Sequence, residues 1–195
     1  MLNNLNYSTN TRFQDVESTK LVPIVDPYNL SDSEINRLIE RYYSTGFVLF
    51  EYKDDVDANR AIETISRQLN LGDPYVPKIY KDHLPNMYGD NKLNVITKAE
   101  SKHKAFNSSN EQKLHTDGTL TDIGTIKTTV LYCIENAHIG GDTILFDSVN
   151  AFKSLLTQDP SAAESLFDPK SLRRATDIGF DAEAIGPVFC NGLDK

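Results

Sequence analysis

The chain has 195 residues and a formal net charge of −8, from 20 basic and 28 acidic residues. This length fits one domain, which is large enough to bury a hydrophobic core without disulfides or a structural metal. The apolar share of 39% and the charged share of 25% exclude a disordered or fibrous chain. No basic run is present, so the usual footprint of a nucleic-acid-binding protein is absent.

The start of the chain lacks the basic and apolar regions of a secretory signal. We expect residues 1–20 to form a mobile arm in front of a single domain over residues 21–195. No run approaches the roughly 20 apolar residues of a transmembrane helix. Cys133 and Cys190 lie far apart and form no C-x-x-C pair. These features predict a cytoplasmic protein without a membrane partner or a disulfide framework.

The first half of the chain predicts helices separated by short strands. Ser31 and Glu34 have the spacing of a capping box, in which each residue satisfies the backbone N–H of the other at a helix start. Gly46 is a typical helix stop. Four elements are expected in chain order: a β-like run at 21–26, a helix from Ser31 to Gly46, a strand at 47–52 and a helix over about 55–70.

The second half predicts mainly strands. β-branched and aromatic residues between turn signals favour extended chain at 93–97, 112–118, 126–137 and 142–148. Gly140 and Gly141 suit a tight turn before the last of these, because glycine adopts positive φ at little cost. Three further elements are expected: a helix from Ser148 to about 157, a helix opened by Asp159 and Pro160, and a strand at 184–189.

The segment "LHTDG" sets His115 and Asp117 two positions apart. In extended chain, residues i and i+2 point to the same face, so the two side chains can share one metal ion. An imidazole and a carboxylate suit non-haem Fe(II), whose facial triad has two histidines and one carboxylate. A bare H-x-D pair arises often by chance, and by itself it does not establish a metal site.

Two linked motifs give the pair a context. The segment "LHTDGT" at 114–119 and the turn "GGDT" at 140–143 resemble the taurine dioxygenase (TauD/TfdA-like) family of iron- and 2-oxoglutarate-dependent oxygenases. The spacing of the two motifs is also similar to that of the family. Leu114 stands where the family usually has tryptophan. The closest resemblance covers residues 114–155, and the helix–strand–helix pattern before it is similar more loosely.

The resemblance implies an α+β fold, a distorted double-stranded β-helix (jelly roll) with flanking N-terminal helices, incomplete at its C-terminus. It implies that His115 and Asp117 are the first two Fe(II) ligands and that the hydroxyl of Thr143 contacts a carboxylate of 2-oxoglutarate. Asp142 is interpreted as a turn residue. The implied enzyme consumes 2-oxoglutarate and O2, hydroxylates a small organic molecule at an unactivated C–H bond, and releases succinate and CO2. Family members often form dimers or tetramers, so a homo-oligomer is an open alternative to a monomer.

The family's second histidine and its 2-oxoglutarate-binding arginine have no counterpart in this sequence. In the family both lie far downstream of the aspartate. Only His138 follows Asp117, and its loop is too close to Asp117, so it is interpreted as a surface residue. His83 and His103 lie in polar segments and are interpreted as loop residues. We therefore expect the third ligand and the arginine to lie beyond Lys195.

Three hypotheses stay open. The leading one is an Fe(II)- and 2-oxoglutarate-dependent dioxygenase whose 195-residue chain is inactive by itself. The second is a truncated or remnant module of this fold that acts in binding or assembly, which the missing histidine and arginine favour. The third is a cupin-type metalloprotein with other chemistry, which the helical N-terminal part disfavours.

Overall fold

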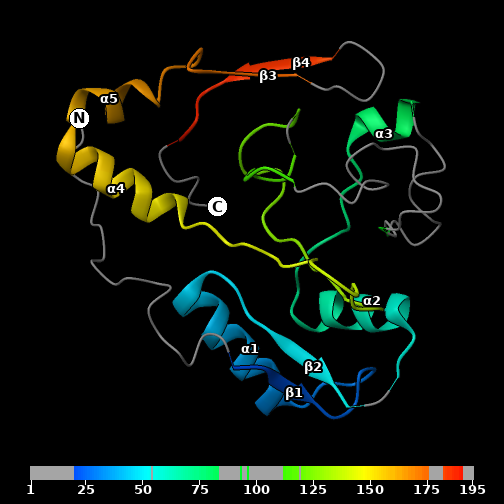
Figure 1. Cartoon of the computed structure of the whole chain (residues 1–195). Coiled ribbons are helices and arrows are strands. Elements are labelled where there is room, and N and C mark those ends of the chain that lie inside the picture. Colours follow the sequence, from blue (N-terminus) through cyan, green and yellow to red (C-terminus); the bar gives the residue numbers. More distant parts are fainter. Residues whose placement is uncertain are drawn as a thin grey trace. The chain divides into compact units, whose positions relative to one another are not determined.

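The computed structural model is an α+β structure with few strands in its described part (Figure 1). It describes residues 20–53, 55–83, 93, 96, 112–118, 120–175 and 182–190. Almost all of the predicted arm at 1–20 and most of the predicted strand at 93–97 lie outside these residues. The chain divides into two compact units, residues 1–71 with 147–150 and residues 72–146 with 151–195. No helix of the described part is long and apolar enough to cross a membrane.

The first unit contains a small parallel sheet with a helical crossover. Strand β1 (Val22–Ile24) pairs with strand β2 (Phe50–Tyr52), and Val22 lies opposite Phe50. Parallel neighbours need a long connection between them, and helix α1 (Asp32–Thr45) provides it (Figure 1). Helix α2 (Ala58–Gln68) follows β2. The four elements expected before residue 71 are thereby confirmed, with shorter bounds for each strand.

The predicted capping box is present at the start of α1. Ser31 is the N-cap, and its hydroxyl accepts a hydrogen bond from the backbone N–H of Glu34 at 3.4 Å. The Glu34 carboxylate accepts from the backbone N–H of Ser31 at 2.7 Å and from that of Val25 at 2.8 Å. Glu34 therefore joins the helix start to the chain that leaves β1. At the other end, Gly46 caps α1 with a φ of 85°.

The surroundings of Glu34 make the chain sensitive to acid. Burial by itself would raise the pKa of the Glu34 carboxyl, but hydrogen bonds from Ser31 and Val25, with the nearby Arg37, hold that pKa below its ordinary value of 4.5. A carboxyl group with a lowered pKa in the folded state stabilises that state above its unfolded pKa. This contribution is lost as the pH falls through the folded pKa.

We expect the free energy of unfolding to fall as the pH drops below 4.5, and to fall less steeply in Glu34→Gln. Urea unfolding followed by circular dichroism, between about pH 3 and pH 7, measures both slopes. Glu40→Gln, an exposed position on the same helix, is the control and should keep the wild-type slope. Equal slopes for wild type and Glu34→Gln would contradict the stabilising role of the charged Glu34.

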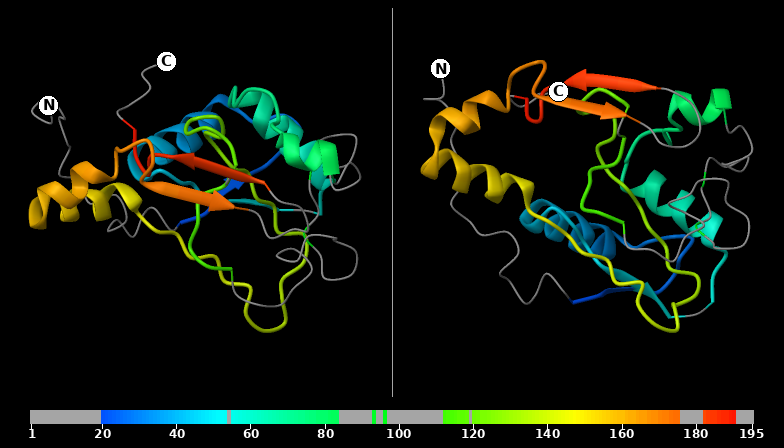
Figure 2. Two further views of the ribbon diagram at one scale, coloured as in Figure 1. Left: turned by 90° about the horizontal axis from the view of Figure 1, so that it is seen from above. Right: turned by 45° about the horizontal axis from the view of Figure 1, so that its top comes forward.

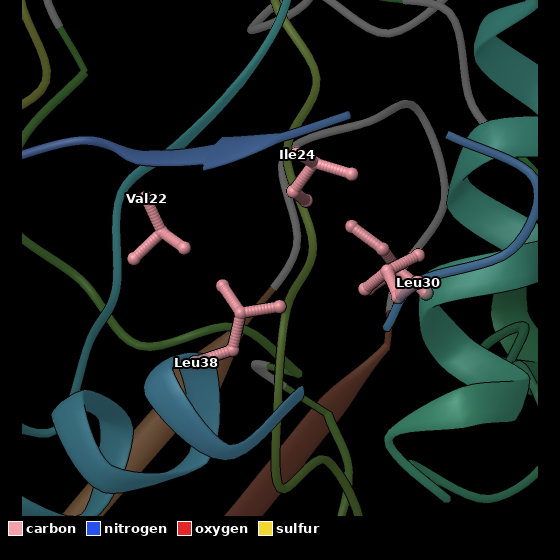
Figure 3. Packing of buried hydrophobic residues seen from close by; sticks show 5 residues of the cluster. Val22, Ile24, Leu30 and Leu38 are labelled. Atoms are coloured by element: carbon pink, nitrogen blue, oxygen red, sulfur yellow. The ribbon is translucent and has the colours of Figure 1, made fainter. Parts of the chain in front are cut away.

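A compact apolar cluster lies between β1, α1 and α2. Figure 3 shows Val22 and Ile24 of β1 directed toward Leu38 of α1, with Leu30 beside them. Together with Ile65 of α2, these side chains form the core of the first unit, and none is more than 4% exposed. The Gln68 amide fastens α2 to the same region, since its Oε1 accepts from the backbone N–H of Leu30 at 2.8 Å.

The second unit contains a two-stranded antiparallel sheet and short helices. Strand β3 (Leu172–Ala175) pairs with strand β4 (Glu183–Gly186), as Figure 2 shows. Helix α3 (Lys78–His83) and helix α5 (Pro160–Ser165) belong to this unit, and helix α4 (Ser148–Gln158) enters it from residue 151 onward. Within it, Phe152 packs against Phe167 and Phe189, with ring centroids 5.5 and 4.8 Å away. The predicted helices at 148 and 160 and the strand near 184 are confirmed.

Three predictions for this unit are wrong. Residues 112–118, 126–137 and 142–147 were expected to be extended strands, but the structure has no regular strand in them. The segment at 172–175 was not expected to be a strand, yet it pairs with β4. His83 lies in α3 and not in a loop. Gly140 and Gly141 do adopt positive φ, of 76° and 81°, as the predicted turn requires.

Candidate metal site

The candidate site lies in the second unit, in an irregular segment that ends at a glycine turn. Gly118, directly after Asp117, has a φ of 80°. A Cβ atom at this position would lie 2.5 Å from Oγ1 of Thr121 and 2.9 Å from Cδ1 of Ile126, and the positive φ also favours glycine. The backbone N–H of Thr121 donates to the Gly118 carbonyl at 2.9 Å and closes the turn. This turn sets the direction of the chain directly after Asp117.

The structure brings His115 and Asp117 together. Nε2 of His115 lies 3.7 Å from Oδ1 of Asp117, and the side chains are 53% and 48% exposed. Nδ1 of His115 lies 2.7 Å from the backbone carbonyl oxygen of Lys113. A carbonyl oxygen can only accept, so Nδ1 carries the proton and donates it. A neutral imidazole carries a proton on only one of its ring nitrogens. With the proton on Nδ1, Nε2 has a free lone pair, and Nε2 is the nitrogen that faces Asp117.

The Asp117 carboxylate has a second partner that the sequence did not suggest. The hydroxyl of Thr129 donates to Oδ2 of Asp117 at 2.6 Å. The two carboxylate oxygens therefore have separate roles, with Oδ2 held by Thr129 and Oδ1 facing His115. Thr129 lies 12 residues after Asp117 in the sequence. No spacing rule relates the two positions, so only the path of the chain reveals the contact.

Tyr80 of α3 is the next group that the sequence did not reveal. Burial raises the pKa of the Tyr80 phenol, and the negative charge of Asp117 raises it further. A charge acts in this way only over a short range, because solvent screens more distant charges. The phenol of α3 therefore lies within the electrostatic range of the Asp117 carboxylate.

Arg174 joins the β3–β4 hairpin to the turn after Asp117. Its Nη1 donates to the backbone carbonyl of Thr121 at 3.2 Å. Gly186 of the neighbouring strand leaves room for the guanidinium, since a Cβ atom there would lie 3.2 Å from Nη2. Nε of Arg174 is buried and has no hydrogen-bond partner among the described residues. A buried donor without a partner costs free energy relative to a hydrogen-bonded one.

The distance between the two side chains bears on whether both can bind one metal ion. Donors about 2.1 Å from an ion are separated by about 3.0 Å at right angles around it and by about 4.2 Å on opposite sides. The observed 3.7 Å between Nε2 of His115 and Oδ1 of Asp117 is longer than the spacing of adjacent ligands, so the two side chains would have to move closer together to bind one octahedral ion. An imidazole nitrogen and a carboxylate oxygen also suit Fe(II). The described residues contain no group of three metal-binding side chains, so within them the pair could supply two ligands at most.

Thr143 is not connected to the pair. It lies exposed in irregular chain, and no hydrogen bond of the described residues links it to His115 or Asp117. Its contact with 2-oxoglutarate stays a prediction, as do the ligand roles of His115 and Asp117. His138 is exposed, as its interpretation as a surface residue requires. His103 lies outside the described residues.

Comparison with known proteins provides an independent line of evidence. The family model described as "Taurine catabolism dioxygenase TauD, TfdA family" matches residues 9–192. A uridine-5′-phosphate dioxygenase from Amycolatopsis sp is 38% identical over 167 residues, which are 85% of this chain and 61% of that protein. A uridine-5′-phosphate dioxygenase from Streptomyces sp is 44% identical over 134 residues, which are 68% of this chain and 47% of that protein. The chain thus spans about half of these relatives, and no solved structure matches it.

Proposed function

The chain belongs to the taurine catabolism dioxygenase TauD, TfdA family, and from this membership we propose that it acts as an Fe(II)- and 2-oxoglutarate-dependent dioxygenase. The proposed reaction adds one oxygen atom of O2 to a C–H bond of a small molecule. The other oxygen atom enters succinate as 2-oxoglutarate loses CO2. The proposed fold is the distorted double-stranded β-helix that the family implies, and the proposed location is the cytoplasm.

The observation that carries the proposal is the pairing of Nε2 of His115 with Oδ1 of Asp117 at 3.7 Å. Each side chain has its other polar atom held by a partner, the Lys113 carbonyl for His115 and the Thr129 hydroxyl for Asp117. Such partners orient metal ligands in proteins. When bound, Fe(II) would supply the oxidative chemistry, with 2-oxoglutarate and O2 as cosubstrates. His115 and Asp117 would hold the ion in place.

The proposed role of Thr143 is to donate a hydrogen bond to a carboxylate of 2-oxoglutarate. Support comes from its place in the "GGDT" turn, where Gly140 and Gly141 adopt the positive φ that the tight turn needs. A carboxylate that leaves water requires such donors. The chain itself carries a net charge of −8, so an anionic cosubstrate depends on the metal and on local donors of this kind.

The proposed substrate is a nucleoside 5′-phosphate. The support is that the two curated relatives are both uridine-5′-phosphate dioxygenases and match 85% and 68% of this chain. These matches include residues on both sides of the candidate site, but they leave a large part of each relative uncovered.

The test uses the protein as its gene encodes it, with Fe(II), ascorbate and 2-oxoglutarate. The panel contains uridine 5′-phosphate, the other nucleoside 5′-phosphates, and uridine without phosphate. We expect succinate formation that depends on a nucleotide, and a product one oxygen atom heavier by mass spectrometry. Uridine should support much less succinate, because it lacks the phosphate charge. Metal binding without succinate formation on any substrate would instead support the binding or assembly module.

A further inference from the structure

We propose that Thr129 is a positioning residue for the metal site, because its hydroxyl holds Oδ2 of Asp117 and so directs Oδ1 toward Nε2 of His115. The inference rests on the proposed function, since it concerns how the same pair binds its ion. It adds a residue that neither the sequence motifs nor the family resemblance indicates. Thr129 itself would not touch the metal.

The contact has the properties of an orienting bond. The distance of 2.6 Å between Oγ1 of Thr129 and Oδ2 of Asp117 is short, as expected when a hydroxyl donates to a charged carboxylate. Asp117 is 48% exposed, so packing does not immobilise its carboxylate. Without a directional donor, the carboxylate would rotate and exchange its two oxygens. Threonine suits the task, because its β-branch restricts rotation about χ1.

The His115 side chain is also oriented by a hydrogen bond. The Lys113 carbonyl accepts from Nδ1 and leaves Nε2 directed toward Asp117. A backbone carbonyl cannot be removed by substitution, whereas the Thr129 hydroxyl can. Thr129 also comes from a separate segment, 12 residues along the chain, so it fixes Asp117 relative to something other than its own turn. The pair is thus oriented from both sides before an ion arrives.

A purely structural role for Thr129 is the competing explanation. In that case the bond would only fasten residues 126–130 to the turn after Asp117, and its loss would lower stability without changing metal affinity. Four variants separate the two roles. Thr129→Val replaces the hydroxyl by a methyl group at nearly constant shape. Thr129→Ser and Thr129→Ala both lack the methyl group and differ from each other only in the hydroxyl. Thr125→Val makes the same change at a nearby exposed threonine.

The readout is the affinity for Mn(II), measured by titration and electron paramagnetic resonance without any substrate. Residues that orient metal ligands typically change metal affinity about 10–100-fold, and we expect Thr129→Val and Thr129→Ala to weaken binding by that factor. Thr129→Ser should stay within about threefold of wild type, because it keeps the donor. Thr125→Val should bind as wild type does. Thermal melts by circular dichroism report separately on stability.

The outcomes are distinguishable. Unchanged Mn(II) affinity in Thr129→Val and Thr129→Ala, or a loss in Thr129→Ser as large as that in Thr129→Ala, would overturn the positioning role. If Thr129→Val does not fold, the serine and alanine variants decide by themselves. His115→Ala is measured in parallel. Should wild type bind Mn(II) no better than His115→Ala, the metal site of the proposed function fails, whatever the Thr129 variants do.

Discussion

Replacing either proposed ligand, as His115→Ala or as Asp117→Ala, should abolish succinate formation. Each change removes one of the two donors that lie 3.7 Å apart, and water would take its place without the same geometry. Loss of a residue that only orients a ligand costs about 10–100-fold in metal affinity or activity, so loss of the ligand itself should cost more than about 100-fold. Succinate release and Mn(II) binding, measured on the protein as its gene encodes it, test both variants.

The chain offers matched controls for these two variants. His138→Ala removes an exposed histidine from the same unit, and Asp142→Ala removes an exposed aspartate beside Thr143. Both should keep wild-type Mn(II) affinity and stability. A loss of metal binding in His138→Ala would show that His138 is a ligand and that its interpretation as a surface residue is wrong. Full activity of Asp117→Ala would contradict the proposed site altogether.

Leu38→Ala should cause the largest loss of stability among single substitutions in the first unit. The Leu38 side chain is 1% exposed and packs between Val22, Ile24 and Leu30 (Figure 3). Truncation of a buried leucine typically costs about 2–5 kcal/mol, from lost apolar contacts and from the cavity that remains. Because small domains are stable by only about 5–15 kcal/mol, this is a large share of the total. Urea unfolding followed by circular dichroism measures the change.

Asn36→Ala is the control for this experiment, because Asn36 is exposed on the same helix. Exposed substitutions usually change stability by less than about 0.5 kcal/mol. Comparing the stability losses of Leu38→Ala and Asn36→Ala therefore isolates the effect of burial from the effect of placing an alanine in the helix. Similar stability of Leu38→Ala and Asn36→Ala would show that the cluster around Leu38 is not the core of this unit.

Features that depend on a few neighbouring residues could be predicted from the sequence. The Ser31–Glu34 capping box and the Gly46 stop define α1, because their hydrogen bonds join groups within one helical turn. The positive φ values of Gly140 and Gly141 follow from the freedom of glycine itself. His115 and Asp117 also lie close together, as their spacing of two positions suggested, although their segment is irregular and not the extended chain that was predicted. The H-x-D and G-G-D-T motifs are also short local patterns, and they were sufficient to indicate the family.

Features that join distant segments could not be predicted. The β-branched run at 126–137 has the composition of a strand, but the structure has no regular strand there, because strand formation depends on tertiary context as well as on composition. The segment at 172–175 lacks strong strand signals, yet it forms β3 because β4 supplies its hydrogen bonds. Composition reports the preference of one segment, whereas pairing depends on two.

By itself the sequence determined the local structure of this protein, the identity of its candidate ligands and its family. Only the tertiary structure decided which groups surround those ligands. Thr129 meets Asp117 across 12 residues, and Arg174 meets the carbonyl of Thr121 across 53. A motif encodes geometry within a few bonds of itself, but contacts over such separations depend on the path of the whole intervening chain. The residues that orient the candidate site therefore become visible only once that path is known.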